Sequence, residues 1–161
     1  MPPRKSTDPT TYVALALRLA LGGYFVWSGY QKVFVHGLSE FTRAVANYKM
    51  VYEPWDAVVA YTVPWVEMVC GVLVVLGLWK RGALWGLAGL VAGFAIGVAH
   101  AQAHKLNIAC GCAGDPDGPP MNYSLMFAKF GGLWLAIFLI WYLGRKGNDH
   151  VFGGTRLKLP G

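Results

Sequence analysis

The chain has 161 residues, of which 55% are hydrophobic and only 14% are charged, and its formal net charge is +6. Its mean hydropathy of +0.41 excludes an ordinary soluble domain, since such domains carry about 25% charged residues. The positive charge does not indicate nucleic-acid binding, because no basic module interleaved with aromatic residues is visible. The composition therefore predicts an integral membrane protein.

Four apolar stretches are long enough to cross a bilayer, which takes roughly 20 residues in a helix. They cover residues 12–35, 55–79, 82–104 and 124–143. The first is too long for the core of a signal peptide and lacks a convincing small-residue cleavage site, so we expect it to be retained. We therefore predict one all-α domain over 12–143, an integral membrane four-helix bundle, flanked by tails at 1–11 and 144–161.

The positions of Lys and Arg predict the orientation. Eight of these residues lie in the two tails and between the second and third spans, against four on the other side, at the end of the first span and in the connections there. Because positively charged connections stay on the cytoplasmic side, both termini are expected in the cytoplasm. The connection between the third and fourth spans then faces the exported side. We expect the protein to lie in the lipid bilayer of a bacterial inner membrane, with this connection in the periplasm.

A further short helix is expected between the first two spans, over residues 39–50. Ser39 is its predicted N-cap, and Glu40 lies in its first turn near the positive end of the helix dipole. Phe41, Val45 and Tyr48 share one face. Two arrangements fit: an interfacial helix lying along the outer surface, or an amphipathic connector packed on the bundle. In both arrangements the helix lies on the same side of the membrane as the connection between the third and fourth spans.

Ionisable residues inside the predicted spans need partners or a polar cavity. Arg18 lies about 9 Å and Glu67 about 18 Å from the same membrane face at 1.5 Å per residue, so only long side chains can bridge them. Glu67 has two other candidate partners, Lys32 and Lys129. One hypothesis is an ion pair that fixes helix register; the other is a proton or quinone site around Glu67. Pro64 is expected to disturb the second span and free a carbonyl there.

Small residues inside the spans predict close helix contacts. Cys70, within the second span, is expected to behave as a small apolar packing residue. The glycines expected at such contacts are Gly22, Gly23, Gly86, Gly89, Gly93 and Gly97.

Cys110, Gly111 and Cys112 lie in the polar connection between the third and fourth spans. Disulfides between cysteines persist on the exported side of a membrane. A disulfide across Cys-Gly-Cys is tight, and strain makes such a bond an exchange partner rather than a structural link. The pattern therefore predicts a redox-active pair with Cys110 and Cys112 as catalytic residues. The alternative is a glycine-rich turn with incidental thiols.

A competing hypothesis is a metal site. His100 and His104 lie four residues apart and thus on one helical face. Together with Cys110 and Cys112 they offer ligand types suited to tetrahedral Zn²⁺ or to a copper ion. Their spacing differs from that of standard zinc modules, and histidines near a membrane interface also act as amphipathic anchors.

Several segments together resemble the MauE branch of the DoxX-like membrane proteins, over roughly residues 12–143. They are the run from Arg18 to Lys32 with Gly22, Phe25, Ser28 and Gly29, the pair Asn47-Tyr48, the run from Pro64 through Glu67 to Gly71 with Gly77, and Cys110-Gly-Cys112-Ala-Gly114. Ala113 stands where the family pattern leads us to expect Phe. The resemblance implies a four-helix membrane protein. MauE is associated with maturation or disulfide formation in methylamine dehydrogenase, and DoxX-like relatives with thiosulfate:quinone oxidoreductases.

The resemblance places a functional expectation on Cys110 and Cys112, with Arg18, Lys32 and Glu67 as motif positions. Three functions follow as hypotheses. The first is thiol–disulfide exchange or maturation support through the Cys-Gly-Cys loop, with a quinone as possible electron acceptor and other membrane or periplasmic redox proteins as partners. The second is a noncatalytic accessory subunit of a larger membrane redox complex. The third is a metal-binding protein.

Overall fold

The computed structural model describes residues 9–106, 108–109, 117 and 120–146. Four of its helices are long and apolar enough to cross a membrane, which confirms the predicted all-α membrane bundle. No strand is found among these residues. The helices are α1 (Pro9–Tyr30), the π-helical segment η1 (Gln31–Val35), α2 (Leu38–Asn47), α3 (Trp55–Leu76), α4 (Lys80–Ala103) and α5 (Tyr123–Lys146).

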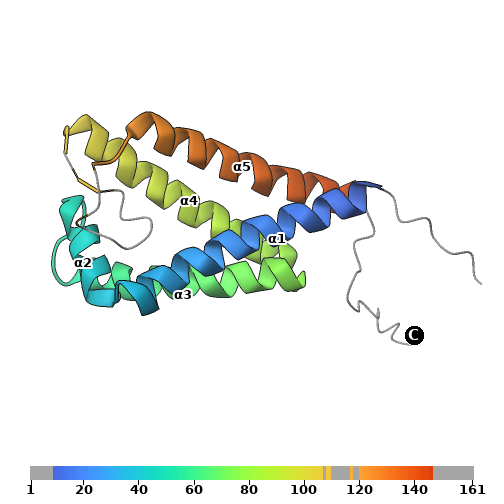
Figure 1. Cartoon of the computed structure of the whole chain (residues 1–161), viewed down its shortest axis with the longest axis horizontal. Helices are drawn as coiled ribbons and strands as arrows, with labels where there is room; N and C mark the ends of the chain where they lie inside the picture. Colours follow the sequence, from blue (N-terminus) through green and yellow to red (C-terminus); the bar gives the residue numbers. More distant parts are fainter. Residues whose placement is uncertain (1–8, 107, 110–116, 118–119, 147–161) are drawn as a thin grey trace, which may run out of the picture.

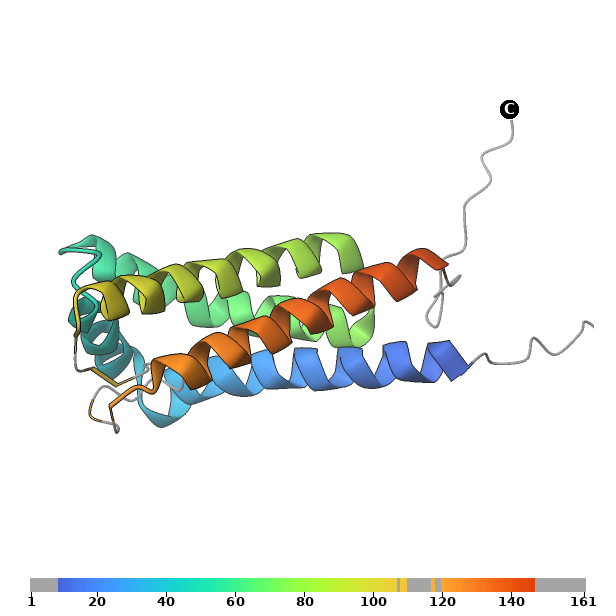
Figure 2. The same ribbon diagram turned by 90° about the horizontal axis from the view of Figure 1, so that it is seen from above.

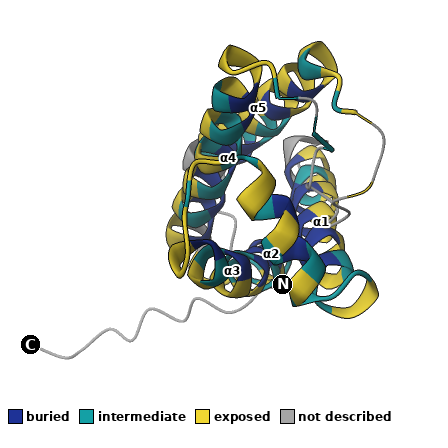
Figure 3. Cartoon of the chain, turned by 90° about the vertical axis from the view of Figure 1, so that its left-hand side faces the viewer, coloured by how far each residue is buried: buried dark blue, intermediate teal, exposed yellow. Residues whose placement is uncertain are grey.

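The four long helices run side by side, and the short α2 lies at one end of the bundle (Figures 1 and 2). The start of α1 and the end of α5 lie together at the opposite end. Packing contacts join α1 to α3, α3 to α4, α4 to α5 and α5 back to α1. Figure 3 looks onto the α2 end, where α2 lies across this ring of helices.

α1 and α3 approach most closely where Gly22 faces Gly71. The absence of side chains at both positions lets the two backbones meet. The predicted close contact at Gly22 is confirmed. It does not extend to Gly23, where an added Cβ would have no neighbour within 4 Å. Cys70 is half-buried against the core, as expected for a packing residue.

The ends of two helices are set by glycines in the left-handed region. Gly77, with φ of 75°, follows α3 and ends it, as is common because glycine has no Cβ penalty there. Gly37, with φ of 85°, is the N-cap of α2. The prediction of Ser39 as N-cap is therefore wrong. The chain turns at Gly37, the Gly37 carbonyl accepts the first helical hydrogen bond from Phe41, and Ser39 is already inside the helix.

α2 packs on the bundle rather than standing away from it. Phe41 and Ala44 are buried against Ala60 of α3, and α2 also contacts η1. The helix ends at Asn47, one turn before the predicted limit at residue 50. Pro64 lies inside α3, yet the helix runs through it unbroken. Its carbonyl packs so tightly on Gly29 that a Cβ there would approach it to 2.7 Å, so contact with α1 supports the helix at this point.

Candidate functional site

The central polar feature of the bundle is an ion pair between Lys32 and Glu67. Lys32 Nζ lies 2.7 Å from each of the two Glu67 carboxylate oxygens. The Lys32 side chain is fully buried and the Glu67 side chain is 1% exposed. Of the partners considered from sequence, the structure therefore selects Lys32. Lys129 is exposed on α5 and does not take this role.

Ser28 completes the cluster. Lys32 Nζ donates to Ser28 Oγ at 3.0 Å, and Ser28 Oγ donates to Glu67 Oε2 at 3.4 Å. Ser28 and Lys32 are four residues apart and so share one face of the helix. The ammonium is further flanked by two rings, with its nitrogen 5.2 Å from the centre of Phe41 and 5.0 Å from that of Phe94, a cation–π arrangement.

The backbone around Lys32 is itself unusual. Residues Gln31–Val35 form a π-helix, and the His36 N–H reaches the Gln31 carbonyl five residues back at 3.0 Å. Such wide turns inside α-helices are rare and frequently mark functional sites. Here the wide turn contains the buried lysine. Nothing in the hydrophobic pattern of residues 12–35 signals it.

Burying two charges costs several kcal/mol per ion, and their attraction offsets this cost only when the geometry is good and the remaining hydrogen bonds are made. The ammonium of Lys32 has three N–H donors, and the carboxylate oxygens and Ser28 accept from it. Among the described residues, no buried side-chain nitrogen or oxygen lacks a partner. The cluster is thus satisfied internally, which fits the hypothesis that it fixes the register of α1 against α3.

A small cavity of about 20 Å³ lies beside the ion pair and is lined in part by Ser28, Lys32, Glu67 and Phe94. A water molecule needs ~10–15 Å³ of such space and two to four polar partners. The cavity therefore has room for one water next to the carboxylate. It is far smaller than a quinone ring would need.

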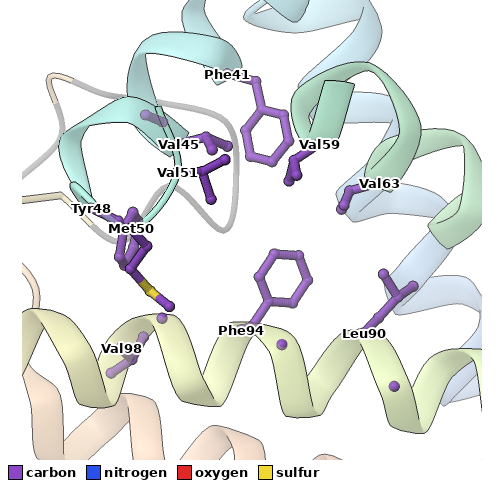
Figure 4. Close-up of a pocket in the computed structure, with 14 residues that line it drawn as sticks. Phe41, Val45, Tyr48, Met50, Val51, Val59, Val63, Leu90, Phe94 and Val98 are labelled. Atoms are coloured by element: carbon purple, nitrogen blue, oxygen red, sulfur yellow. The ribbon is translucent and has the colours of Figure 1, made fainter. Parts of the chain in front are cut away.

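A much larger apolar cavity of about 240 Å³ lies between α2, α3 and α4. Phe41 of α2 and Phe94 of α4 point into it from opposite sides, and Val59 and Val63 of α3 form another wall (Figure 4). Phe94 borders both cavities. The Phe94 ring thus separates the polar cluster from the apolar space.

The glycines of α4 form the floor of this cavity. Gly89, Gly93 and Gly97 all line it, and a Cβ added to Gly89 or Gly93 would meet nothing within 4 Å. Their expected role in helix contact is therefore wrong at these two positions, because the space above them is open. Gly97 faces the ring of Tyr48, and Gly86 faces the sulfur of Cys70.

Tyr48 forms part of the wall at the end of α2. Burial, together with the neighbouring Tyr123 phenol, raises the pKa of Tyr48 to about 12. The phenol is therefore neutral at physiological pH.

Cys110 and Cys112 lie outside the described residues, but the residues flanking them are described. Ala109 pairs with Pro120 in an antiparallel bridge, and the Met121 N–H donates to the Ile108 carbonyl at 3.0 Å. The Tyr123 hydroxyl donates to the Leu106 carbonyl. The connection therefore leaves the bundle and returns to it at one point.

The same connection contacts α2. Arg43 of α2 lies with Nη2 3.5 Å from Asp117 Oδ1, and its Nη1 lies 2.6 Å from Glu40 Oε2. The Arg43, Asp117 and Glu40 side chains are 58%, 76% and 38% exposed, so each pair contributes at most ~1 kcal/mol. The pairs nevertheless place α2 next to the connection that contains the thiols.

His100 and His104 stack at the end of α4 with ring centres 4.3 Å apart. Their shared face is confirmed. Among the described residues no group of three or more His, Cys, Asp or Glu gathers as a metal site. The other two residues of the hypothetical set, Cys110 and Cys112, lie outside this part of the chain, so the metal hypothesis stays a prediction.

Arg18 does not meet Glu67. Its Nε donates to the Val74 carbonyl at 3.1 Å and its Nη2 to the Val75 carbonyl at 3.3 Å. These carbonyls belong to the last turn of α3, where intrahelical partners run out, and a cation there also interacts favourably with the helix dipole. The buried arginine therefore caps α3 from α1.

Comparison with known proteins gives one family. The family described as methylamine utilisation protein MauE matches residues 10–143. This match covers both cavities and all but the outermost residues of the four long helices. No curated protein and no solved structure matches the chain.

Proposed function

The chain belongs to the MauE family, and we propose that it is a membrane thiol–disulfide redox protein that supports maturation of an exported client. Cys110 and Cys112 are the proposed reactive pair. The family's link to methylamine utilisation supports an accessory role in that process rather than turnover of the amine itself.

The observation that carries this proposal is the bridge between Ala109 and Pro120, which holds together the two ends of the Cys-Gly-Cys connection. Cys110 directly follows Ala109, which pairs with Pro120. The anchored residues lie at the α2 end of the bundle, opposite the start of α1 and the end of α5 (Figure 1). A pair of thiols attached to these anchored residues is presented to partners on one side of the membrane only. The Lys and Arg residues near the two termini favour the cytoplasmic side for the start of α1 and the end of α5. The α2 end, with the cysteine connection, then faces the exported side.

The proposed chemistry is exchange through a mixed disulfide. A client thiolate attacks the Cys110–Cys112 disulfide, one cysteine sulfur leaves as a thiolate, and a second client thiolate resolves the mixed disulfide. The client gains a disulfide, and two electrons and two protons pass to the cysteine pair. A lipid-soluble quinone is the proposed acceptor that reoxidises the pair and becomes a hydroquinone.

The test is the state of the two thiols in protein isolated gently with its partners. Alkylation and mass spectrometry are performed before and after a mild reductant, and separately after a chelator, with Cys70→Ser to remove the third cysteine. A Cys110–Cys112 disulfide that opens with the reductant supports the proposal. Thiols released only by the chelator indicate metal binding. Thiols that label freely in a stable larger complex indicate a noncatalytic accessory subunit.

A further inference from the structure

The apolar cavity between α2, α3 and α4 is positioned to receive a molecule from the bilayer. Among its lining residues Gly89, Gly93 and Met50 are exposed, so the cavity opens along their side. Gly89 and Gly93 belong to a membrane-spanning segment. The surface at that depth faces lipid rather than water. A ligand therefore enters laterally, dissolved in the membrane.

The glycine floor keeps this space open. Alanine is the better helix former by roughly 0.5–1 kcal/mol, and a Cβ at Gly89 or Gly93 would fit without any clash. Neither helix packing nor backbone conformation therefore requires glycine at these two positions. What glycine provides there is volume inside the cavity.

The walls select the shape and polarity of the ligand. Phe41, Phe94 and Tyr48 contribute aromatic rings, against which planar rings stack in offset or edge-on geometry. Among the described lining residues, Tyr48 alone has a polar side-chain group. A charged ligand is therefore excluded. A flat neutral ring with few polar atoms gains stacking on these aromatic side chains in addition to burial, whereas an acyl chain gains burial alone.

The volume indicates that only part of the ligand is enclosed. At about 240 Å³ the cavity is smaller than the ~300–1,000 Å³ of sites that enclose a whole drug-sized molecule. It suits the ring end of a molecule whose apolar tail remains between the lipids.

We infer that this cavity binds the ring of a membrane quinone, which enters between α3 and α4 and lies between Phe41 and Phe94. This inference rests on the proposed function for the need of a two-electron acceptor, but the binding itself depends on the cavity alone. The proposed quinone site thus lies in the apolar cavity, on the other side of the Phe94 ring from Glu67, where the sequence had suggested it.

The test uses a photoreactive azidoquinone and the purified full-length protein in detergent micelles. The label is located by mass spectrometry of peptides, and excess decylubiquinone or excess phosphatidylcholine serves as competitor. We expect labelling within residues 41–63 or 89–98 that decylubiquinone suppresses and phosphatidylcholine does not. Labelling elsewhere, or equal suppression by the phospholipid, would overturn the inference, the latter because the cavity would then hold acyl chains.

Two glycine variants supply the matched comparison. Gly93→Leu fills the cavity and should reduce labelling at least about tenfold, since overpacking an occupied site costs that much or more. Gly132→Leu on α5 adds the same side chain where a Cβ also meets nothing, away from the cavity lining, and should leave labelling unchanged. Circular dichroism checks that both fold, and Gly89→Val replaces Gly93→Leu if that variant does not. Equal labelling in the cavity variant and the control contradicts the inference.

A chain carrying Cys110→Ser and Cys112→Ser separates the two proposals. If the cavity binds quinone, this chain is labelled like the original. Retained labelling together with freely reactive thiols in the original chain would remove the proposed function and leave the binding site. A reducible disulfide without specific labelling would do the reverse.

Discussion

Gly22 of α1 and Gly71 of α3 face each other so closely that a Cβ built on Gly22 would lie 2.6 Å from the Gly71 carbonyl oxygen. The reciprocal Cβ on Gly71 would lie 2.8 Å from the Gly22 carbonyl oxygen. Real Cβ atoms do not approach backbone this closely, so any side chain at either position pushes the helices apart. Lys32 lies in η1, which directly follows α1, and Glu67 lies in α3, so this contact sets the separation across which that ion pair forms.

Gly22→Ala should therefore destabilise the bundle by ~1–3 kcal/mol, the usual cost of overpacking. The adjacent Gly23 provides the control, because a Cβ there has no neighbour within 4 Å. Gly23→Ala should be neutral or stabilise the protein by ~0.4–1 kcal/mol through the unfolded chain. Unfolding in sodium dodecyl sulfate, followed by circular dichroism, measures both. Equal stability of the two variants would contradict the close approach.

Glu67→Met should be the more damaging of two related changes at the ion pair. It leaves the buried Lys32 ammonium without its carboxylate, which costs ~3–5 kcal/mol. The double variant Lys32→Met with Glu67→Met removes both charges and should recover much of that loss. The same unfolding assay compares them. If the single and double variants are equally unstable, packing rather than charge determines the loss.

Gly77→Ala should destabilise the end of α3. The αL conformation at Gly77 costs a residue with a Cβ roughly 1–2 kcal/mol, and the added carbon would also overlap the Arg18 guanidinium. Gly82→Ala is the control, because its Cβ meets only an ordinary contact with Trp79 at 3.9 Å. Thermal unfolding should separate the two variants. A Gly77→Ala protein as stable as Gly82→Ala would contradict this account of the helix end.

Tyr48 should contribute a loss of stability at alkaline pH. Its folded-state pKa of about 12 exceeds the ordinary tyrosine value, because burial and Tyr123 disfavour the phenolate. Stability from the neutral phenol is therefore complete below about pH 10 and declines as pH rises towards 12, by up to ~2 kcal/mol. Comparing unfolding at pH 9 and pH 11.5 tests this. Tyr48→Phe should show a shallower decline than the original chain, and parallel curves would count against it.

The long helices could be predicted from sequence because each contains a predominantly apolar run of about 20 residues, and bilayer thickness sets that required length. For the partner of Glu67, the sequence alone leaves three candidate cations, Arg18, Lys32 and Lys129. Rise per residue gives depth in the membrane, whereas the choice among cations also depends on which helix face each occupies. Lys32 reaches Glu67 because it projects inward from η1, while Lys129 is exposed on α5.

The role of the α4 glycines and the start of α2 cannot be predicted from the spacing of residues alone. Glycines spaced by four predict helix contacts at Gly89 and Gly93, but identical spacing also results when a helix borders a cavity. Only the position of α2 distinguishes these cases, and Gly37 rather than Ser39 sets where α2 begins. Ser28 belongs to the run that resembles the family, and its spacing of four residues from Lys32 is the sequence signal that the two side chains lie together.

The bridge between Ala109 and Pro120 has a consequence for how this protein diversifies. Since the chain departs from the bundle and rejoins it at one place, exchanging residues 110–119 for a segment of different length or chemistry should leave the packing of α4 on α5 unchanged. A chimaera that carries a different loop between Ala109 and Pro120 should keep the same transmembrane scaffold. On this account, the transmembrane scaffold and the connection between α4 and α5 are separable, modular parts.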